Sequence, residues 1–224
     1  MKKQSKLKLA VVIISFILLL FSGYLLVPTF FGDTVYPLPK EYAPKIVELS
    51  DKYDVPPAFF AALIFAESGF HATSRSSAGA VGLTQMMPST ARYTAQVVNY
   101  TGKIDLTNPD VSLELGAAHL SILFKEYNTL NSYDQRRAVL ASYNAGGGVG
   151  DAWVESGLRS KFLSRGVEGY VNKIMFLERV YEQAYADELG ITEKVSIQAA
   201  KPNESDWRSN FWYYALSRNF KLGL

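Results

Sequence analysis

The chain has no cysteine, and its 224 residues include only two histidines. The lack of cysteine excludes disulfides, thiol nucleophiles, thiolate metal sites and the acylated cysteine of a bacterial lipoprotein. The histidines, His71 and His119, are far apart in the sequence and belong to no motif with metal-ligand spacing. A histidine metal site or a Ser-His-Asp triad is therefore disfavoured.

Charge of one sign is also lacking, because the formal net charge is only +2. A basic surface that would attract a polyanion is not indicated, so we expect no nucleic acid partner. No segment has sustained strand alternation, and no internal repeat is visible. Helical spacing of apolar residues dominates instead, and it predicts a mainly α protein with one well-buried domain.

The N-terminus has the composition of a membrane anchor. Residues 1–8 form a basic stub with four lysines, and residues 9–27 are 19 residues without a charge. As a helix this run would rise about 28 Å, close to the roughly 30 Å hydrocarbon core of a bilayer. No convincing cleavage site follows, which favours a transmembrane anchor over a cleaved signal peptide, and the uninterrupted apolar run disfavours a buried helix of the domain. The lysines predict a cytoplasmic N-terminus, with the remainder in the periplasm or at the outer face.

The rest of the chain divides into three parts. Residues 28–41 contain three prolines and predict an extended tether. Residues 42–187 have helical periodicity and are expected to form the folded domain. Residues 188–224 form a C-terminal extension, for which docking on the domain is the simplest role and contact with the membrane, a sugar or a partner in an envelope-spanning machine is the alternative. Its aromatic cluster consists of Trp207, Phe211, Trp212, Tyr213 and Tyr214.

Proline, glycine and apolar spacing predict where the helices lie. Ile46, Leu49 and Tyr53 share one face of a first helix. Asp54 is expected to cap a second helix, which should end at Gly69. Further helices are expected after Pro88 and Pro109, over residues 134–150, where the helix runs into a glycine loop, and over the amphipathic residues 169–189.

Glu67 stands at the end of an apolar run, with no other carboxylate until Asp105. A glutamic acid that donates a proton near neutral pH needs a raised pKa, which an apolar pocket and the negative pole of a helix C-terminus provide. Cleavage of a glycosidic bond begins with such a donor, and a second carboxylate is dispensable when the substrate supplies the nucleophile. The alternative is a carboxylate that is simply solvated at a helix end.

Three blocks of sequence, in order, resemble the SLT-type lytic transglycosylases of the lysozyme-like superfamily. These are "AESGF" with "SSAGAVGLTQMMPSTA", then "ASYNAG", then "GYVNKI". The resemblance covers roughly Tyr42 to Tyr185 and implies a lysozyme-like fold. It also implies cofactor-free cleavage of the β-1,4 bond between N-acetylmuramic acid and N-acetylglucosamine in peptidoglycan strands, with a 1,6-anhydro end as product.

The resemblance assigns roles to single residues. Glu67 matches the general acid/base of the family. Six other positions match residues that line the glycan groove or close over the acid: Ser76, Gln85, Met87, Tyr143, Asn144 and Tyr170. Each of the six also has a structural reading, as a loop cap, a turn residue or core filler.

The chain departs from the family pattern at two positions. Gly166 stands where an acidic residue is common, with Glu168 as the nearest acid, and Thr84 replaces a bulky apolar residue. The glycines after Asn144 lack the context of a phosphate loop and are expected to form a flexible groove lip. The leading hypothesis is a membrane-anchored lytic transglycosylase. A hydrolytic muramidase of the same fold and a non-catalytic glycan-binding scaffold are the alternatives.

Overall fold

The structure is a computed structural model that describes Ser15 and residues 35–191. The predicted anchor at residues 9–27, apart from Ser15, and the aromatic cluster of the C-terminal extension lie outside the described residues. Within the described part of the chain, no helix combines the length and the apolar character needed to cross a membrane. The helices are α2 (Ala43–Tyr53), α3 (Pro57–Ser68), α4 (Pro88–Val97), α5 (Pro109–Glu126), α6 (Ser132–Ala145), α7 (Gly147–Glu155), the 3-10 turn η1 (Ser160–Phe162) and α8 (Arg165–Ala184).

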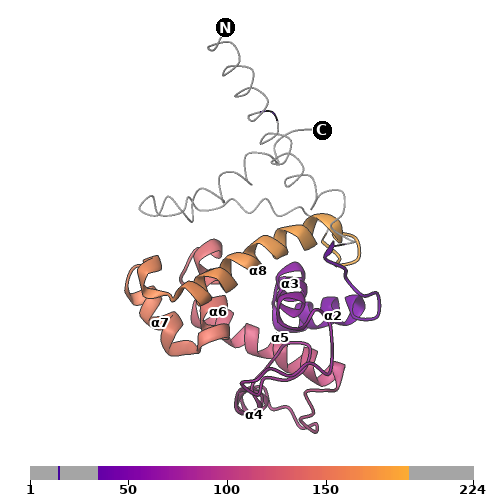
Figure 1. The fold of residues 1–224 in the computed structure, drawn as a ribbon. Helices are drawn as coiled ribbons and strands as arrows, with labels where there is room; N and C mark the ends of the chain where they lie inside the picture. The colour runs from indigo at the N-terminus through magenta and orange to yellow at the C-terminus, as the bar shows by residue number, and fades with distance from the viewer. Residues whose placement is uncertain (1–14, 16–34, 192–224) are drawn as a thin grey trace.

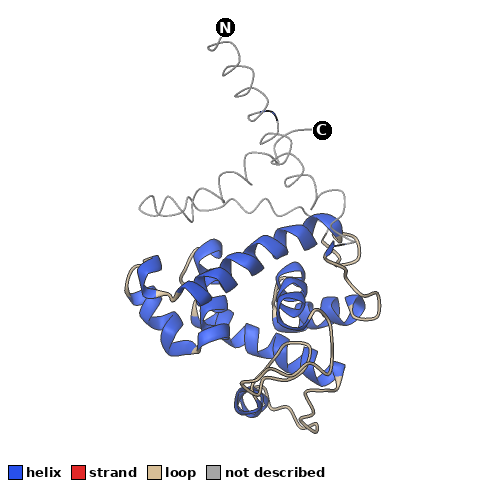
Figure 2. Ribbon diagram, viewed as in Figure 1, coloured by secondary structure: helices blue, strands red, loops and turns tan. Residues whose placement is uncertain are grey.

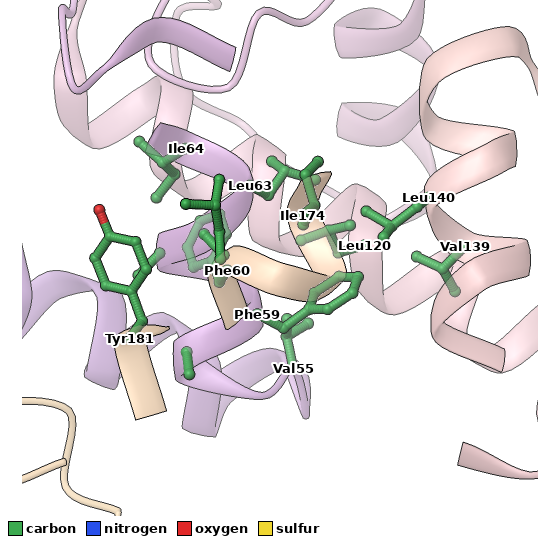
Figure 3. Close-up of a cluster of buried hydrophobic side chains, with 14 of the residues drawn as sticks. Val55, Phe59, Phe60, Leu63, Ile64, Leu120, Val139, Leu140, Ile174 and Tyr181 are labelled. Carbon is green, nitrogen blue, oxygen red and sulfur yellow. The ribbon is translucent and has the colours of Figure 1, made fainter. Parts of the chain in front are cut away.

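Helix α3 occupies the centre of the domain because it is apolar on every side. Every residue from Ala58 to Ile64 is buried. A helix without a polar face is stable only when other helices surround it, and α8, α2 and α5 lie around α3 (Figure 1). In Figure 3, Phe59 and Leu63 of α3 lie among side chains that include Leu120 of α5 and Ile174 of α8. The mainly α prediction is confirmed, and Figure 2 shows helices and loops over the described residues.

The first helix boundary differs from the prediction in one detail. Ile46 and Leu49 are buried on α2 as expected. Asp54 does not cap α3; it ends α2 in a left-handed conformation with φ 54°. Helix α3 starts only at Pro57, because the residue before a proline is sterically excluded from the helical region, and Pro56 is accordingly extended. Gly69 ends α3 with φ 59°, as expected.

The glycines after α6 form a helix rather than the expected loop. Only Gly146 interrupts the helices, with φ 91°, and α7 begins at the next residue. Trp153 of α7 is fully buried. A Cβ at Gly150 would meet the hydroxyl of Ser142 and lie 2.6 Å from that of Tyr127. This glycine therefore permits the close packing of α7 on α6, which is its physical role.

The segment between α3 and α4 forms a small lobe with its own core. Within residues 35–191, β structure is limited to the isolated bridges between Arg75 and Val81 and between Val81 and Met86. The lobe is packed through apolar residues of this segment, α4, α5 and the connection before α5. They are Val81, Met86, Ala91, Ala95, Leu106 and Leu115.

Part of the expected tether packs on the domain. The Leu38 amide donates a hydrogen bond of 3.1 Å to the Tyr185 hydroxyl, and the Tyr181 hydroxyl donates one of 3.1 Å to the Pro37 carbonyl. Leu38 is buried in the main core, as is Leu189 beyond α8. The folded unit therefore includes residues on both sides of the expected domain.

Replacing Gly82 by alanine should destabilise the fold strongly. Gly82 has φ 86°, and a Cβ there would overlap the Leu106 carbonyl and lie 2.6 Å from Ser112 Oγ. We expect the free energy of unfolding to fall by more than about 2 kcal/mol. The matched control is Gly169→Ala on α8, where a Cβ meets nothing within 4 Å and helix propensity should add up to about 1 kcal/mol. Urea unfolding of both variants tests this, and equal stabilities would contradict it.

Candidate active site

A groove of about 800 Å³ runs between the small lobe and the end of α6. Residues from 76 to 90 supply much of its lining, and residues 142–147 supply another part. Glu67 of α3, Tyr93 of α4, and His119 and Leu123 of α5 complete the lining. Five helices, α3 to α7, and the loop before α4 thus contribute to a single concave surface.

Glu67 lies in the last turn of α3 and is half-buried. Its Oε1 accepts a hydrogen bond of 2.6 Å from the hydroxyl of Tyr170 on α8. Burial raises the pKa of Glu67, while the Tyr170 hydrogen bond and the positive charge of Lys173 oppose the rise without cancelling it. Among the groove-lining residues in the described part of the chain, Glu67 is the only carboxylic acid. The site therefore presents one acid that tends to keep its proton.

The loop opposite Glu67 is held by hydrogen bonds from three helices. The Ser68 hydroxyl at the end of α3 donates to the Leu83 carbonyl at 2.7 Å, and the Tyr143 hydroxyl of α6 donates to the Thr84 carbonyl at 2.8 Å. The Thr84 hydroxyl donates to the Ser112 carbonyl of α5 at 3.3 Å. Helix α3 thus positions both Glu67 and, through Ser68, the loop that forms the groove wall.

Thr84, which departs from the family pattern, fits its position through its small size. It is fully buried, and a Cβ on Gly116 of α5 would lie only 2.5 Å from its methyl group. The close approach of loop and helix leaves no room for a larger side chain at either position.

Five of the six predicted binding residues line the groove together with Glu67: Ser76, Gln85, Met87, Tyr143 and Asn144. Two of them, Gln85 and Ser76, also form hydrogen bonds to the backbone of their own loop. The Gln85 amide nitrogen donates to the Ser74 carbonyl at 3.0 Å and to the Gly82 carbonyl at 2.9 Å, and the Ser76 hydroxyl accepts the Ala80 amide at 3.0 Å. These side chains shape the loop as well as face the groove.

Tyr170 has a different position from the other predicted residues. It is not among the groove-lining residues, and its hydroxyl instead contacts the Glu67 carboxylate. Gly166 and Glu168 lie in the first turn of α8, and neither lines the groove. The missing family acid is therefore not replaced at the groove surface of the described chain.

Sequence reasoning missed three residues near the acid. Tyr93 of α4 is 54% exposed at the groove, and His119 of α5 lines it. The Lys173 ammonium donates to the Ala66 carbonyl at 3.2 Å, beside Glu67. The sequence analysis considers His119 only as a metal ligand or a triad member. Lys173 lies within the third sequence block and Tyr93 outside all three, and only the folded arrangement brings both to the site.

The described domain thus has a buried central helix that ends in a half-buried glutamic acid at a groove. Residues 45–162 match the transglycosylase SLT domain. The match covers more than half of the chain, so the chain belongs to the transglycosylase SLT domain family. The resemblance to this family is thereby confirmed, and the matched residues include the first two sequence blocks.

The relatives are much longer proteins. The chain is 30% identical over 116 residues to membrane-bound lytic murein transglycosylase C of Actinobacillus pleuropneumoniae serotype 5b, over 49% of this chain and 32% of the relative. It is 33% identical over 119 residues to a putative soluble lytic murein transglycosylase of Haemophilus influenzae. That alignment covers 52% of this chain and 19% of the relative. The X-ray structure of an inactive glutamate-to-glutamine mutant of lytic transglycosylase Slt from Pseudomonas aeruginosa matches this chain with a TM-score of 0.60 and 25% identity. The match covers 70% of this chain and 26% of that structure's chain. The chain thus spans a third or less of each relative.

Replacing Glu67 by glutamine should stabilise the domain at neutral pH. Burial raises the pKa of Glu67 in the folded state, so its stabilising effect is present below the ordinary pKa of glutamic acid and is lost as the pH rises through the folded-state value. The free energy of unfolding of E67Q minus that of the wild type should be positive at pH 8 and fall toward zero at pH 4. All other titrating groups are common to both proteins, so a pH-independent difference would contradict the assignment.

Proposed function

We propose that this chain is a membrane-anchored lytic transglycosylase that cleaves the β-1,4 bond between N-acetylmuramic acid and N-acetylglucosamine in peptidoglycan. The observation that carries the proposal is the single carboxylic acid, Glu67, among the described residues that line the groove. A glycosidase that uses a second carboxylate, either to activate water or as the nucleophile, needs that carboxylate within a few ångströms of the sugar. A groove with one acid suits a reaction in which the sugar supplies the nucleophile.

The reaction has two proton transfers through the same residue. Protonated Glu67 gives its proton to the bridging oxygen as the bond from that oxygen to C1 of the muramic acid breaks, and the N-acetylglucosamine leaves with a free hydroxyl. The acetamido group of the muramic acid supports the positive charge at C1. The O6 hydroxyl then forms a bond to C1 and loses its proton to the Glu67 carboxylate. The ring closes as a 1,6-anhydro sugar, and Glu67 regains its initial state.

The surroundings of Glu67 suit both steps. Burial raises the pKa of Glu67, which favours the protonated form that donates the proton. The hydrogen bond from Tyr170 occupies Oε1, so Oε2 is the atom that exchanges the proton with the substrate. Tyr170 and Lys173 stabilise the carboxylate that forms in the first step, and burial favours its return to the acid form in the second step.

Product analysis tests the proposed reaction. The wild-type chain digesting purified sacculi should release 1,6-anhydro-muropeptides, which mass spectrometry distinguishes from hydrolysed products by the mass of one water. Glu67→Gln should lower the turnover rate about a thousandfold, because it removes the general acid/base. The matched control is Glu168→Gln, which changes an acid of α8 that does not line the groove and should keep the rate within about threefold.

The alternatives predict different results. Reducing-end products would assign the chain as a hydrolytic muramidase. Glycan binding without any turnover by the wild type would assign it as a scaffold. Full activity of Glu67→Gln would contradict the catalytic assignment, and loss of activity in Glu168→Gln would indicate that this acid supports the site after all.

The anchor is proposed from the sequence of residues 9–27, which has the length and composition of a transmembrane helix. Deleting residues 1–27 should move the protein from the membrane fraction to the soluble fraction of cells, with the specific activity on sacculi unchanged. The control is the full chain carrying Glu67→Gln, which should stay in the membrane fraction without activity. Retention of the truncated protein in washed membranes would contradict the proposal.

A further inference from the structure

His119 lies in the groove, and the proposed chemistry at Glu67 makes no use of it. The ring is half-buried, and its centroid lies 5.5 Å from that of the Tyr143 ring. Leu123 follows one turn later on α5, so the two side chains share a face of the helix and both line the groove. His119 therefore lies in the groove beside one apolar side chain and one aromatic ring.

The hydrogen bond to Thr94 determines which ring nitrogen carries the proton. Thr94 of α4 is fully buried, and its hydroxyl lies 3.3 Å from His119 Nδ1. Among the described residues, this is the only hydrogen bond of that hydroxyl. A buried hydroxyl needs an acceptor for its proton, so Thr94 donates to Nδ1. In the neutral ring the proton is then on Nε2.

Nε2 is open to the groove. It has no hydrogen-bond partner among the described residues, and it is not one of the buried side-chain atoms that lack a partner. Since His119 lines the groove, this N–H is available to a ligand there. The ring thus has one nitrogen bound to the protein and one free to bind a substrate.

The ring is uncharged under ordinary conditions. Burial lowers the pKa of His119 to about 4, and no carboxylate offsets that effect. Within the described part of the chain, His119 belongs to no group of side chains suited to a metal ion. A proton carrier or a metal ligand is thereby disfavoured, and what the groove receives is a neutral N–H donor beside apolar surface.

We propose that His119 is a specificity-determining residue that donates a hydrogen bond from Nε2 to the acetamido carbonyl of an N-acetylated sugar in the groove. The amide oxygen of that group accepts the hydrogen bond, and its methyl group contacts Leu123 and the Tyr143 ring. A de-N-acetylated sugar has an ammonium group instead, which offers no acceptor and is disfavoured among apolar side chains. The inference rests on the proposed function, because it requires a glycan in the groove.

Binding to the full chain that carries Glu67→Gln tests the inference without turnover. The probes are a chito-oligosaccharide and its fully de-N-acetylated counterpart of equal length, measured by calorimetry in detergent. Adding His119→Phe should weaken binding of the acetylated probe about tenfold, the effect of one lost hydrogen bond, and leave binding of the other probe unchanged. His119→Gln should restore affinity to within about threefold, because its amide N–H lies the same number of bonds from Cα.

A second readout uses the active chain. His119→Phe alone should raise KM for sacculi with kcat within about threefold, since the residue binds substrate but does not exchange a proton with it. Circular dichroism of each variant checks that the fold is kept.

The outcomes separate the inference from the proposed function. Unchanged affinity in His119→Phe, or an equal loss for both probes, would overturn the inference alone. Failure of the Glu67→Gln chain to bind either probe would count against the proposed function and against the inference with it. A selective loss for the acetylated probe that glutamine restores supports both.

Discussion

The architecture depends on a helix that must be buried on every side. Helix α3 has no polar face, so the other helices have to enclose it, and after the buried residues Ala58 to Ile64 its last turn is partly exposed. Glu67 stands in that turn. Its raised pKa is therefore a consequence of the core, because the same burial that stabilises residues Ala58 to Ile64 also removes water from the carboxyl group. Stability and the proposed chemistry have one physical origin here.

The groove wall is fastened to the same elements that enclose the acid. Ser68, the residue after Glu67, binds the loop at Leu83, and Tyr143 binds it at Thr84. Gly82 and Gly116 allow the loop to approach α5 more closely than any side chain would permit. A displacement of the loop must therefore break contacts at the end of α3 and on α6, so the distance between wall and acid is controlled by the core rather than by the loop itself.

Most of the helices and the central acid could be predicted from the sequence, because apolar spacing, prolines and Gly69 determine where helices begin and end through local interactions. The contact between Tyr170 and Glu67 joins residues that are 103 positions apart, and no local pattern specifies it. The helix at Gly147 was missed for a related reason: three glycines have weak helix propensity, and tertiary packing of Trp153 and Gly150 against α6 overrides it. His119 belongs to no local motif, and its neighbours Thr94 of α4 and Tyr143 of α6 meet it only in the fold.

The described chain enters and leaves the domain at one corner. Residues 36–38 are hydrogen-bonded to Tyr181 and Tyr185, and Leu189 is buried just beyond the end of α8. The C-terminal part of α8 therefore ties the residues before α2 to the folded unit, and both ends of the described chain depend on contacts made in one place.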